Sequence, residues 1–273
     1  MATILITGGL GYVGSATTIP FEEQGHRCVL VDKKNGVNTL NILKILRIVY
    51  REKPKAIVHL AAKKSVGESL QHPLSYYFNN VGSTLSVALV SALFKVPVVF
   101  ASSAAIYSPH NSYAKGKLIE ERIISKLSRH VILRYFNIGG QMVGVKDEQS
   151  TNIFSVINSA AVSGATFVVN NAHSTRDYVH VRDIGKANLK AVEHLLAGGG
   201  PFLTDICSAK QHSVIDILEL YRSNNINLNI EYHNVPDVTI FPTKRLGHLI
   251  GWKASSTFAE VVQSEIDPLK EVK

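Results

Sequence analysis

Short runs of branched apolar residues recur along the first half of the chain, with little alternation between apolar and polar positions. Such runs are typical of strands that are buried on both faces of a parallel sheet. On this pattern we predict strands at residues 3–7, 27–32, 56–61, 97–102 and 130–135.

Between these runs the apolar positions follow a helical period. The predicted helices cover residues 39–53, 75–95 and 113–128. Strands that alternate with helices favour right-handed crossover connections and a doubly wound sheet. The first half therefore predicts an α/β fold with helices on both faces of a parallel sheet.

After about residue 140 the pattern becomes mixed. Helical spacing is found at residues 151–164, 182–198 and 212–222, and short strand-like runs at residues 166–169, 202–206 and 229–233. We predict a sheet domain at residues 1–140 and a smaller α+β lobe at residues 141–273. Segments near residues 174–207 are candidates to return to the first domain.

The overall composition is that of a globular protein, with 45% hydrophobic and 18% charged residues among 273. The net charge of +8 is scattered over short segments, which favours an anionic ligand such as a nucleotide over nucleic acid. Cys28 and Cys207 form no CxxC pair, and no apolar run reaches about 18 residues. We therefore expect a cytoplasmic protein without a membrane segment, and the histidine spacing predicts no metal.

The stretch ILITGGLGYVG places four glycines at a strand-to-helix turn. Gly9 and Gly11 suit a tight turn that a pyrophosphate can approach, and Gly14 suits close packing of the helix on the strand. Asp32 ends the next predicted strand, where a carboxylate can accept hydrogen bonds from an adenosine ribose. Its charge favours NAD over NADP, so we predict an NAD site here; the alternative is a tight turn without a ligand.

A second group of polar residues follows the fourth predicted strand. Ser103 closes that strand, and Tyr113 and Lys117 lie four residues apart, hence on one face of the next helix. A free phenol has a pKa of about 10, so a neighbouring ammonium group helps it to act as a base at neutral pH. The alternative is an incidental pair on a surface helix.

In these motifs the chain resembles the extended short-chain dehydrogenase/reductase family, and within it the UDP-hexose 4-epimerases. The resemblance rests on TGGLGYVGS, HLAAKKSVGESLQHPLSYYFNNVGSTL, SSAAIYS with YAKGK, LRYFNIGG and RDYVHVRD. It runs in blocks from residue 3 to about residue 195. It implies a Rossmann-like sheet, NAD as cofactor and a UDP-sugar as substrate.

The resemblance also implies roles for individual residues. The group implied to hold NAD is Gly8, Gly11, Tyr12, Val13, Gly14, Asp32, Ala61, Lys64, Asn79, Lys117, Tyr135 and Phe136. The group implied to face the UDP-sugar is Ser103, Tyr113, Asn137, Asn152 and Arg176. Plainer interpretations are that Asn79 and Asn137 cap turns, that Lys64 is solvated, and that Arg176 pairs with Asp177.

In the implied reaction, Tyr113 takes the proton of the sugar 4-hydroxyl while a hydride passes from C4 to NAD. The 4-keto sugar then turns over in the site and takes the hydride back on its other face. Lys117 assists the base, and Ser103 hydrogen-bonds the reacting hydroxyl. The family also implies a homodimer through helices 75–95 and 113–128.

Four departures from the family pattern qualify this expectation. Between Asp32 and residue 56 the chain is short, so we expect that an outer strand, a helix and the family's adenine-binding acid are missing. The loop between Tyr107 and residue 112 is also short, and no second arginine precedes Asp237. Pro20 is expected to kink or shorten the first helix. Two alternatives stay open, namely another nucleotide-sugar enzyme, such as a dehydratase or reductase, and a non-catalytic NAD-binding sensor.

Overall fold

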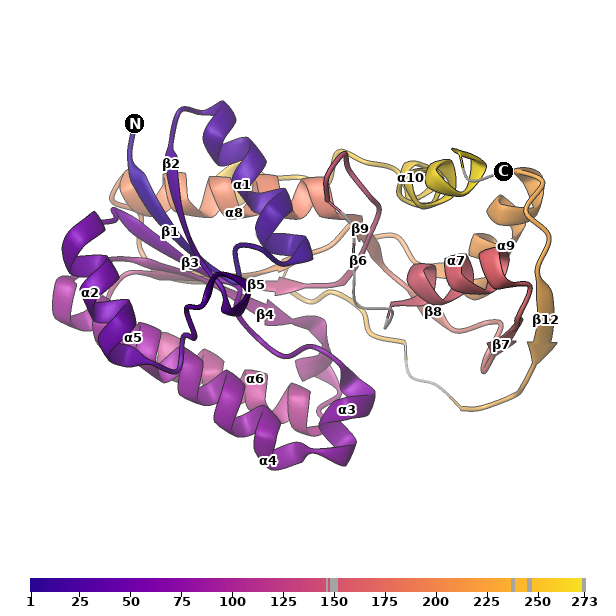
Figure 1. Cartoon of the computed structure of the whole chain (residues 1–273), viewed down its shortest axis with the longest axis horizontal. Coiled ribbons are helices and arrows are strands. Elements are labelled where there is room, and N and C mark those ends of the chain that lie inside the picture. Colours follow the sequence, from indigo (N-terminus) through magenta and orange to yellow (C-terminus); the bar gives the residue numbers. More distant parts are fainter. Residues whose placement is uncertain (146, 148–151, 237–238, 245–246, 272–273) are drawn as a thin grey trace.

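The computed structural model describes residues 1–145, 147, 152–236, 239–244 and 247–271. Its centre is a parallel sheet in the order β10-β5-β4-β3-β1-β2 (Figure 1). The strands of this sheet are β1 (Thr3–Thr7), β2 (Arg27–Val31), β3 (Ala56–His59), β4 (Val98–Ser103), β5 (His130–Tyr135) and β10 (Phe202–Ile206). The predicted doubly wound parallel sheet is confirmed.

Helices cover both faces of the sheet (Figure 1). One face carries α1 (Tyr12–Glu23) and α8 (Val181–Leu196), whose side chains share a core with the sheet. The other carries α2 (Ile42–Glu52), α5 (Gly82–Phe94) and α6 (Ser112–Ile124). Because apolar side chains of the strands are buried on both sides, the strand sequences read as continuous apolar runs.

The connection between β2 and β3 shows the expected shortening. After β2 come a 3₁₀ turn, η1 (Lys33–Asn35), and α2, which crosses β1 to reach β3. No strand intervenes, all residues of this connection being described, so β2 is the edge of the sheet. The short sequence between Asp32 and β3 therefore removed the outer strand without disturbing the order of the others.

The predicted helix at residues 75–95 is divided in the structure. It consists of α4 (Pro73–Tyr76), a π-helical turn η2 (Tyr77–Val81) and α5, and it is preceded by α3 (Val66–Gln71). A π-turn is invisible to a pattern of period 3.6 and is often found at functional sites. Here it contains Asn79, one of the residues implied to line the NAD groove.

The remainder of the chain forms a smaller body beside the sheet, at the right of Figure 1. Its core joins α7 (Ile153–Ser163), α9 (Val214–Ser223) and α10 (Phe258–Glu271). The shorter strands are β6 (Asn137–Gly139), β7 (Thr166–Val169), β8 (Thr175–Arg176), β9 (Tyr178–His180), β11 (His212–Ser213) and β12 (Asn229–Tyr232). The 3₁₀ turns η3 (Ala104–Tyr107) and η4 (Gly247–Ile250) contact the sheet domain, η3 at α6 and η4 at α8 and β10. Residues 202–206 have a strand-like pattern and belong to the segments named as candidates to return to the first domain. They lie in the main sheet as β10.

Pro20 lies inside α1, but the helix continues to Glu23, so the expected shortening is wrong. Proline has no N–H group, which deprives the Ala16 carbonyl of its usual helical partner. Gly185 of α8 approaches that same carbonyl so closely that a Cβ atom there would lie 2.4 Å from the oxygen. Close packing against α8 thus covers α1 at the point where its own hydrogen bonding is interrupted.

Candidate active site

The glycine turn after β1 is held by close backbone contacts. Gly8 has φ +69°, and a Cβ atom on it would lie 2.8 Å from the backbone nitrogen of Ala61. A Cβ atom on Gly14 would lie 2.1 Å from the carbonyl oxygen of Gly8. Gly11 is the N-cap of α1, and no side chain caps the helix. The N–H groups of the first turn are therefore open to an anion, and this turn fits a pyrophosphate.

The carboxylate of Asp32 lies beside this turn. Its Oδ2 accepts a hydrogen bond from the backbone N–H of Leu10 at 3.2 Å, and its Oδ1 accepts one from that of Lys34 at 3.0 Å. The next residue, Lys33, donates to Oδ1 of Asn79 at 2.7 Å. Asp32 is thus tied to the glycine turn at the end of β2, where the ribose of a bound dinucleotide is expected.

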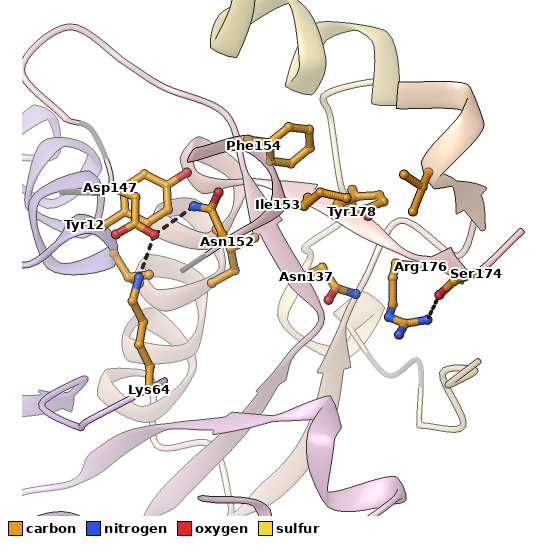
Figure 2. A pocket seen from close by; sticks show the side chains of 13 residues that line it. Tyr12, Lys64, Asn137, Asp147, Asn152, Ile153, Phe154, Ser174, Arg176 and Tyr178 are labelled. Atoms are coloured by element: carbon orange, nitrogen blue, oxygen red, sulfur yellow. Dashed lines mark hydrogen bonds and ion pairs between the residues drawn. The ribbon is translucent and has the colours of Figure 1, made fainter. Parts of the chain in front are cut away.

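A cavity of about 460 Å³ extends from the start of α1 to the smaller lobe (Figure 2). Six residues that the sequence selected for the NAD or UDP groups share it: Tyr12, Val13, Lys64, Asn137, Asn152 and Arg176. The remaining lining residues are Ile138, Asp147, Ile153, Phe154, Ser174, Tyr178 and Val214. The structure therefore brings three residues of each predicted group to one cavity of a size that suits a nucleotide. The other predicted residues, Ser103 and Tyr113 among them, do not line it.

Asp147 joins residues from both sides of this cavity, and the sequence interpretation missed it. Its Oδ2 is 2.7 Å from Nζ of Lys64 and accepts a hydrogen bond of 2.8 Å from Nδ2 of Asn152 (Figure 2). The Lys64 ammonium also lies 5.7 Å from the centre of the Tyr12 ring, a cation–π contact. Lys64 is therefore held at the cavity and is not simply solvated.

The two asparagines of the predicted UDP group also serve the local backbone. Asn152 is the N-cap of α7, accepting from the N–H of Ser155 at 2.8 Å. Asn137 donates through Nδ2 to the carbonyl oxygen of Asp177 at 3.1 Å. Both line the cavity, so a structural role and a ligand contact are compatible for each.

Arg176 extends along the other end of the cavity (Figure 2). One guanidinium nitrogen donates to Oγ of Ser174 at 2.8 Å and to the carbonyl oxygen of Thr175 at 2.9 Å. The neighbouring Asp177 carboxylate accepts instead from Ser208 and from the backbone of Ala209. These contacts orient a planar cation at the cavity wall, which suits phosphate oxygens. The position before Asp237, where the family pattern has a second arginine, adjoins residues outside the described ranges.

The predicted catalytic residues lie at the carboxyl edge of the sheet. Ser103 ends β4, and its Oγ accepts from the N–H of Ala105 at 3.2 Å. Tyr113 lies in the first turn of α6 and is partly exposed. Lys117 is buried one turn further on, with Nζ 2.9 Å from the Ala101 carbonyl oxygen and 3.1 Å from Oε2 of Glu120. The ammonium group thus has protein partners on the inner side of the helix.

The residues implied to flank the nicotinamide are both buried. The Tyr135 hydroxyl donates to Oδ1 of Asn188 on α8 at 2.7 Å, and its ring lies in the core. Phe136 packs beside Tyr107 with 6.5 Å between the ring centres. These contacts give Tyr135 a packing role, and the nicotinamide contact stays a prediction for both residues.

Comparison with known proteins decides the family. The family described as "NAD dependent epimerase/dehydratase family" matches residues 4–203, most of the chain. The chain belongs to this family. The family resemblance stated from the motifs is therefore confirmed, and the glycine turn and Asp32 lie in a family defined by its use of NAD.

Several relatives of this NAD-dependent epimerase/dehydratase are named UDP-glucose 4-epimerase. The protein of Rhizobium leguminosarum bv. trifolii is 26% identical over 315 residues, covering 97% of this chain and 96% of that one. That of Neisseria meningitidis serogroup C is 28% identical over 318 residues, covering 95% and 91%. These alignments are longer than the 273 residues of this chain, in keeping with its shortened form.

Solved structures share the fold. The UDP-glucose 4-epimerase of Brucella ovis in complex with NAD superimposes with a TM-score of 0.89 at 24% identity, covering 96% of both chains. The enzyme of Stenotrophomonas maltophila, with bound NAD and formylated UDP-arabinopyranose, gives 0.91 at 21% identity over the full length of both. Within the described residues, no helix is long and apolar enough to cross a membrane, and no group of three candidate metal ligands is found.

Proposed function

We propose that this family member is an NAD-dependent UDP-hexose 4-epimerase. The observation that carries the proposal is the single cavity shared by the start of α1 and by Asn137, Asn152 and Arg176. One end offers helix N–H groups for the pyrophosphate of NAD, and the other offers a guanidinium and amides for a UDP group. The names of the relatives support the same substrate class.

The residues of the chain have separate tasks in this proposal. Gly9 and Gly11 allow the backbone to approach the pyrophosphate, Gly8 and Gly14 allow the turn to pack closely, and Asp32 accepts from the adenosine ribose. Arg176 binds a phosphate of the substrate, with Asn137 and Asn152 beside the same group. The ion pair between Lys64 and Asp147 joins the two sides of the cavity. When the ligands fill the cavity, this pair must either separate or stay at the rim.

The chemistry is assigned to the carboxyl edge of the sheet. Tyr113 accepts the proton of the sugar 4-hydroxyl and later returns it, and Ser103 hydrogen-bonds the same oxygen. Bound NAD supplies a hydride acceptor that also gives the hydride back, so the net reaction is an isomerisation. A site that retains the 4-keto sugar between the two transfers allows the return to the opposite face of C4.

The test is incubation of the purified protein with UDP-galactose and NAD, followed by separation of the nucleotide sugars. We expect UDP-glucose to form, and a Tyr113→Phe variant that still binds NAD to form none. A dehydratase would instead give a 4-keto-6-deoxy sugar. Ala104 and Ala105 stand where dehydratases have an acidic pair after the serine or threonine, which argues against that outcome. Bound NAD without conversion of any UDP-hexose would contradict the proposal and favour a sensor.

We also propose that the chain forms a homodimer through α5 and α6 and acts in the cytoplasm. These helices lie side by side on the outer face of the sheet domain (Figure 1). On α5, Leu85, Leu89 and Leu93 recur at helical spacing and are 46%, 52% and 65% exposed, with Ile119 of α6 at 39%. Such a stripe suits a second copy of the same face. Sedimentation should give a dimer that Leu89→Glu converts to monomer; a monomeric wild type would contradict it.

A further inference from the structure

A buried carboxylate lies directly beside the lysine of the Tyr-x-x-x-Lys pair. Glu120 is 0% exposed and Lys117 is 3% exposed, and Nζ of the lysine is 3.1 Å from Oε2 of the glutamate. The ammonium also lies 4.6 Å from the centre of the Phe100 ring. The two residues are three apart on one helix, so their charges lie on the same face, which is shielded from solvent. Screening by water is therefore weak, and each charge strongly affects its surroundings.

A chain of hydrogen bonds leads from the glycine turn to this carboxylate. The N–H of Ala61 donates to Oγ1 of Thr7, which lies 2.6 Å from Nδ1 of His59. Nε2 of His59 is 3.1 Å from Oγ1 of Thr84, and the Thr84 hydroxyl donates to Oε2 of Glu120 at 2.9 Å.

One arrangement of protons satisfies every contact in this chain. Because the Thr84 hydroxyl gives its only proton to Glu120, it must accept one from Nε2 of His59. Nδ1 then accepts from the Thr7 hydroxyl, which is free to donate because it accepts from the backbone. All donors thus run towards Glu120, which is the arrangement that stabilises a negative charge on it. Burial, and next the nearby Lys117, lower the pKa of His59 to about 3, so the imidazole is neutral, as this arrangement requires.

The second carboxylate oxygen distinguishes Glu120 from the adjacent Glu121. Oε1 of Glu120 is buried and has no hydrogen-bond partner among the described residues. Glu121 is instead bound at both oxygens by Arg134, at 2.9 and 2.7 Å, and by the Ser102 hydroxyl. The charge of Glu121 is therefore matched within its own cluster, and Glu120 is the carboxylate on α6 that acts on Lys117.

We infer that Glu120 is a positioning residue that holds Lys117 and offsets its positive charge, and that it thereby sets the pH at which Tyr113 loses its proton. Lys117 lies one turn from Tyr113, and Glu120 lies a further three residues along the same helix. An unpaired ammonium favours the phenolate, whereas a paired one favours it less. The inference rests on the proposed role of Tyr113 as the base.

Other charged groups near α6 do not supply this effect. The titratable residues on the elements packed against it are Glu68, Tyr76, Tyr77, Tyr107, His130, Arg134 and Tyr135. His59 of β3 reaches α6 through Thr84. Glu68 is paired with Lys63 and accepts from the Tyr76 hydroxyl. Arg134 is paired with Glu121, and its remaining nitrogen donates to the Tyr107 hydroxyl. On α6 itself, Lys115 is exposed and Arg122 lies near its solvent-facing end.

The experiment measures ionisation of Tyr113 in protein without substrate, by the ultraviolet absorbance of the phenolate as the pH is raised. The chain has ten tyrosines, so each series is repeated with Tyr113→Phe added, and the difference isolates this one group. We expect Glu120→Gln to lower the midpoint by about one pH unit, because the Lys117 ammonium, one turn from Tyr113, loses the carboxylate that offsets its charge. Glu120→Asp keeps the charge and should restore a midpoint close to that of the wild type.

Two further variants separate charge from folding. Thr84→Val removes the hydrogen bond to Glu120 without changing any charge, so it should reduce thermal stability while leaving the midpoint in place. If Glu120→Gln does not fold, Glu120→Leu removes the charge and fills the same space. An unchanged midpoint in a folded Gln or Leu variant, or an equal shift in Thr84→Val, would overturn the inference. A shift without any epimerase activity would leave this inference standing and contradict the proposed function instead.

Discussion

Replacing Gly14 by alanine tests the glycine turn on which cofactor binding depends. The added Cβ atom would lie 2.1 Å from the carbonyl oxygen of Gly8 and 2.7 Å from both Cα and C of Gly9. All three are backbone atoms, so no side chain can rotate away. To accept the methyl group, α1 and the turn must separate by about 1 Å, and overpacking of this kind costs about 1–3 kcal/mol.

A second effect opposes this steric cost. Gly14 lies inside α1, where alanine favours the helix over glycine by about 1 kcal/mol. With backbone on every contacted side we take the upper end of the steric cost, which leaves a net loss of about 2 kcal/mol. For a chain of this size, that lowers the midpoint of thermal unfolding by about 5 °C. The displaced N–H groups should also weaken NAD binding by about tenfold, which corresponds to about 1.4 kcal/mol.

The assay pairs thermal unfolding with titration of NAD by calorimetry. Gly67→Ala is the matched control, because Gly67 lies in the exposed helix α3 and a Cβ atom added there would meet nothing within 4 Å. It should keep or slightly raise the stability, by up to about 1 kcal/mol, and leave NAD affinity unchanged. If Gly14→Ala matched this control in both measurements, the turn would not be under the steric constraint described.

Three further substitutions probe the packing and the buried polar groups. Gly185→Ala places a Cβ atom 2.4 Å from the Ala16 carbonyl oxygen and should lower stability by about 1–2 kcal/mol in thermal unfolding; an unchanged midpoint would show that α8 can move aside. Burial, and to a smaller extent the charge of Lys117, lower the pKa of His59 in the folded protein to about 3. As the pH falls below about 6.5, His59 is therefore protonated in the unfolded chain but not in the folded protein. Between pH 7.5 and pH 5, the free energy of unfolding of the wild type should therefore fall by about 2 kcal/mol more than that of His59→Asn. Equal decreases for the two proteins in urea titrations would refute this. Tyr135→Phe removes the hydrogen bond to Asn188 and should cost about 1–2 kcal/mol with NAD affinity unchanged, whereas weaker NAD binding would favour the nicotinamide contact.

The strands and their doubly wound arrangement could be predicted because the signals for them are local. Each strand is a short apolar run, and the glycine turn and Asp32 lie within one crossover unit. The edge position of β2 followed from the few residues between Asp32 and β3. Phe202–Ile206 has the same local pattern, but the sequence left open which domain it joins, and only the pairing with β5 assigns it to the sheet.

The missed features depend on contacts between distant parts of the chain. Asp147 lies in a segment without periodicity and meets Lys64 from 83 residues away. The role of Glu120 depends on Thr84 and His59, which reach it only through tertiary packing. Pro20 was expected to disturb α1 because the compensating approach of Gly185 is not visible in the sequence.

The central claim is that this chain epimerises a UDP-hexose at C4 by removing and returning one hydride. The most direct measurement uses UDP-galactose labelled with deuterium at C4, with NAD, and follows the product by mass and by nuclear magnetic resonance. We predict UDP-glucose that keeps the deuterium at C4, with no net accumulation of reduced cofactor. Absence of conversion, or UDP-glucose that has exchanged its deuterium for solvent hydrogen, would contradict the account.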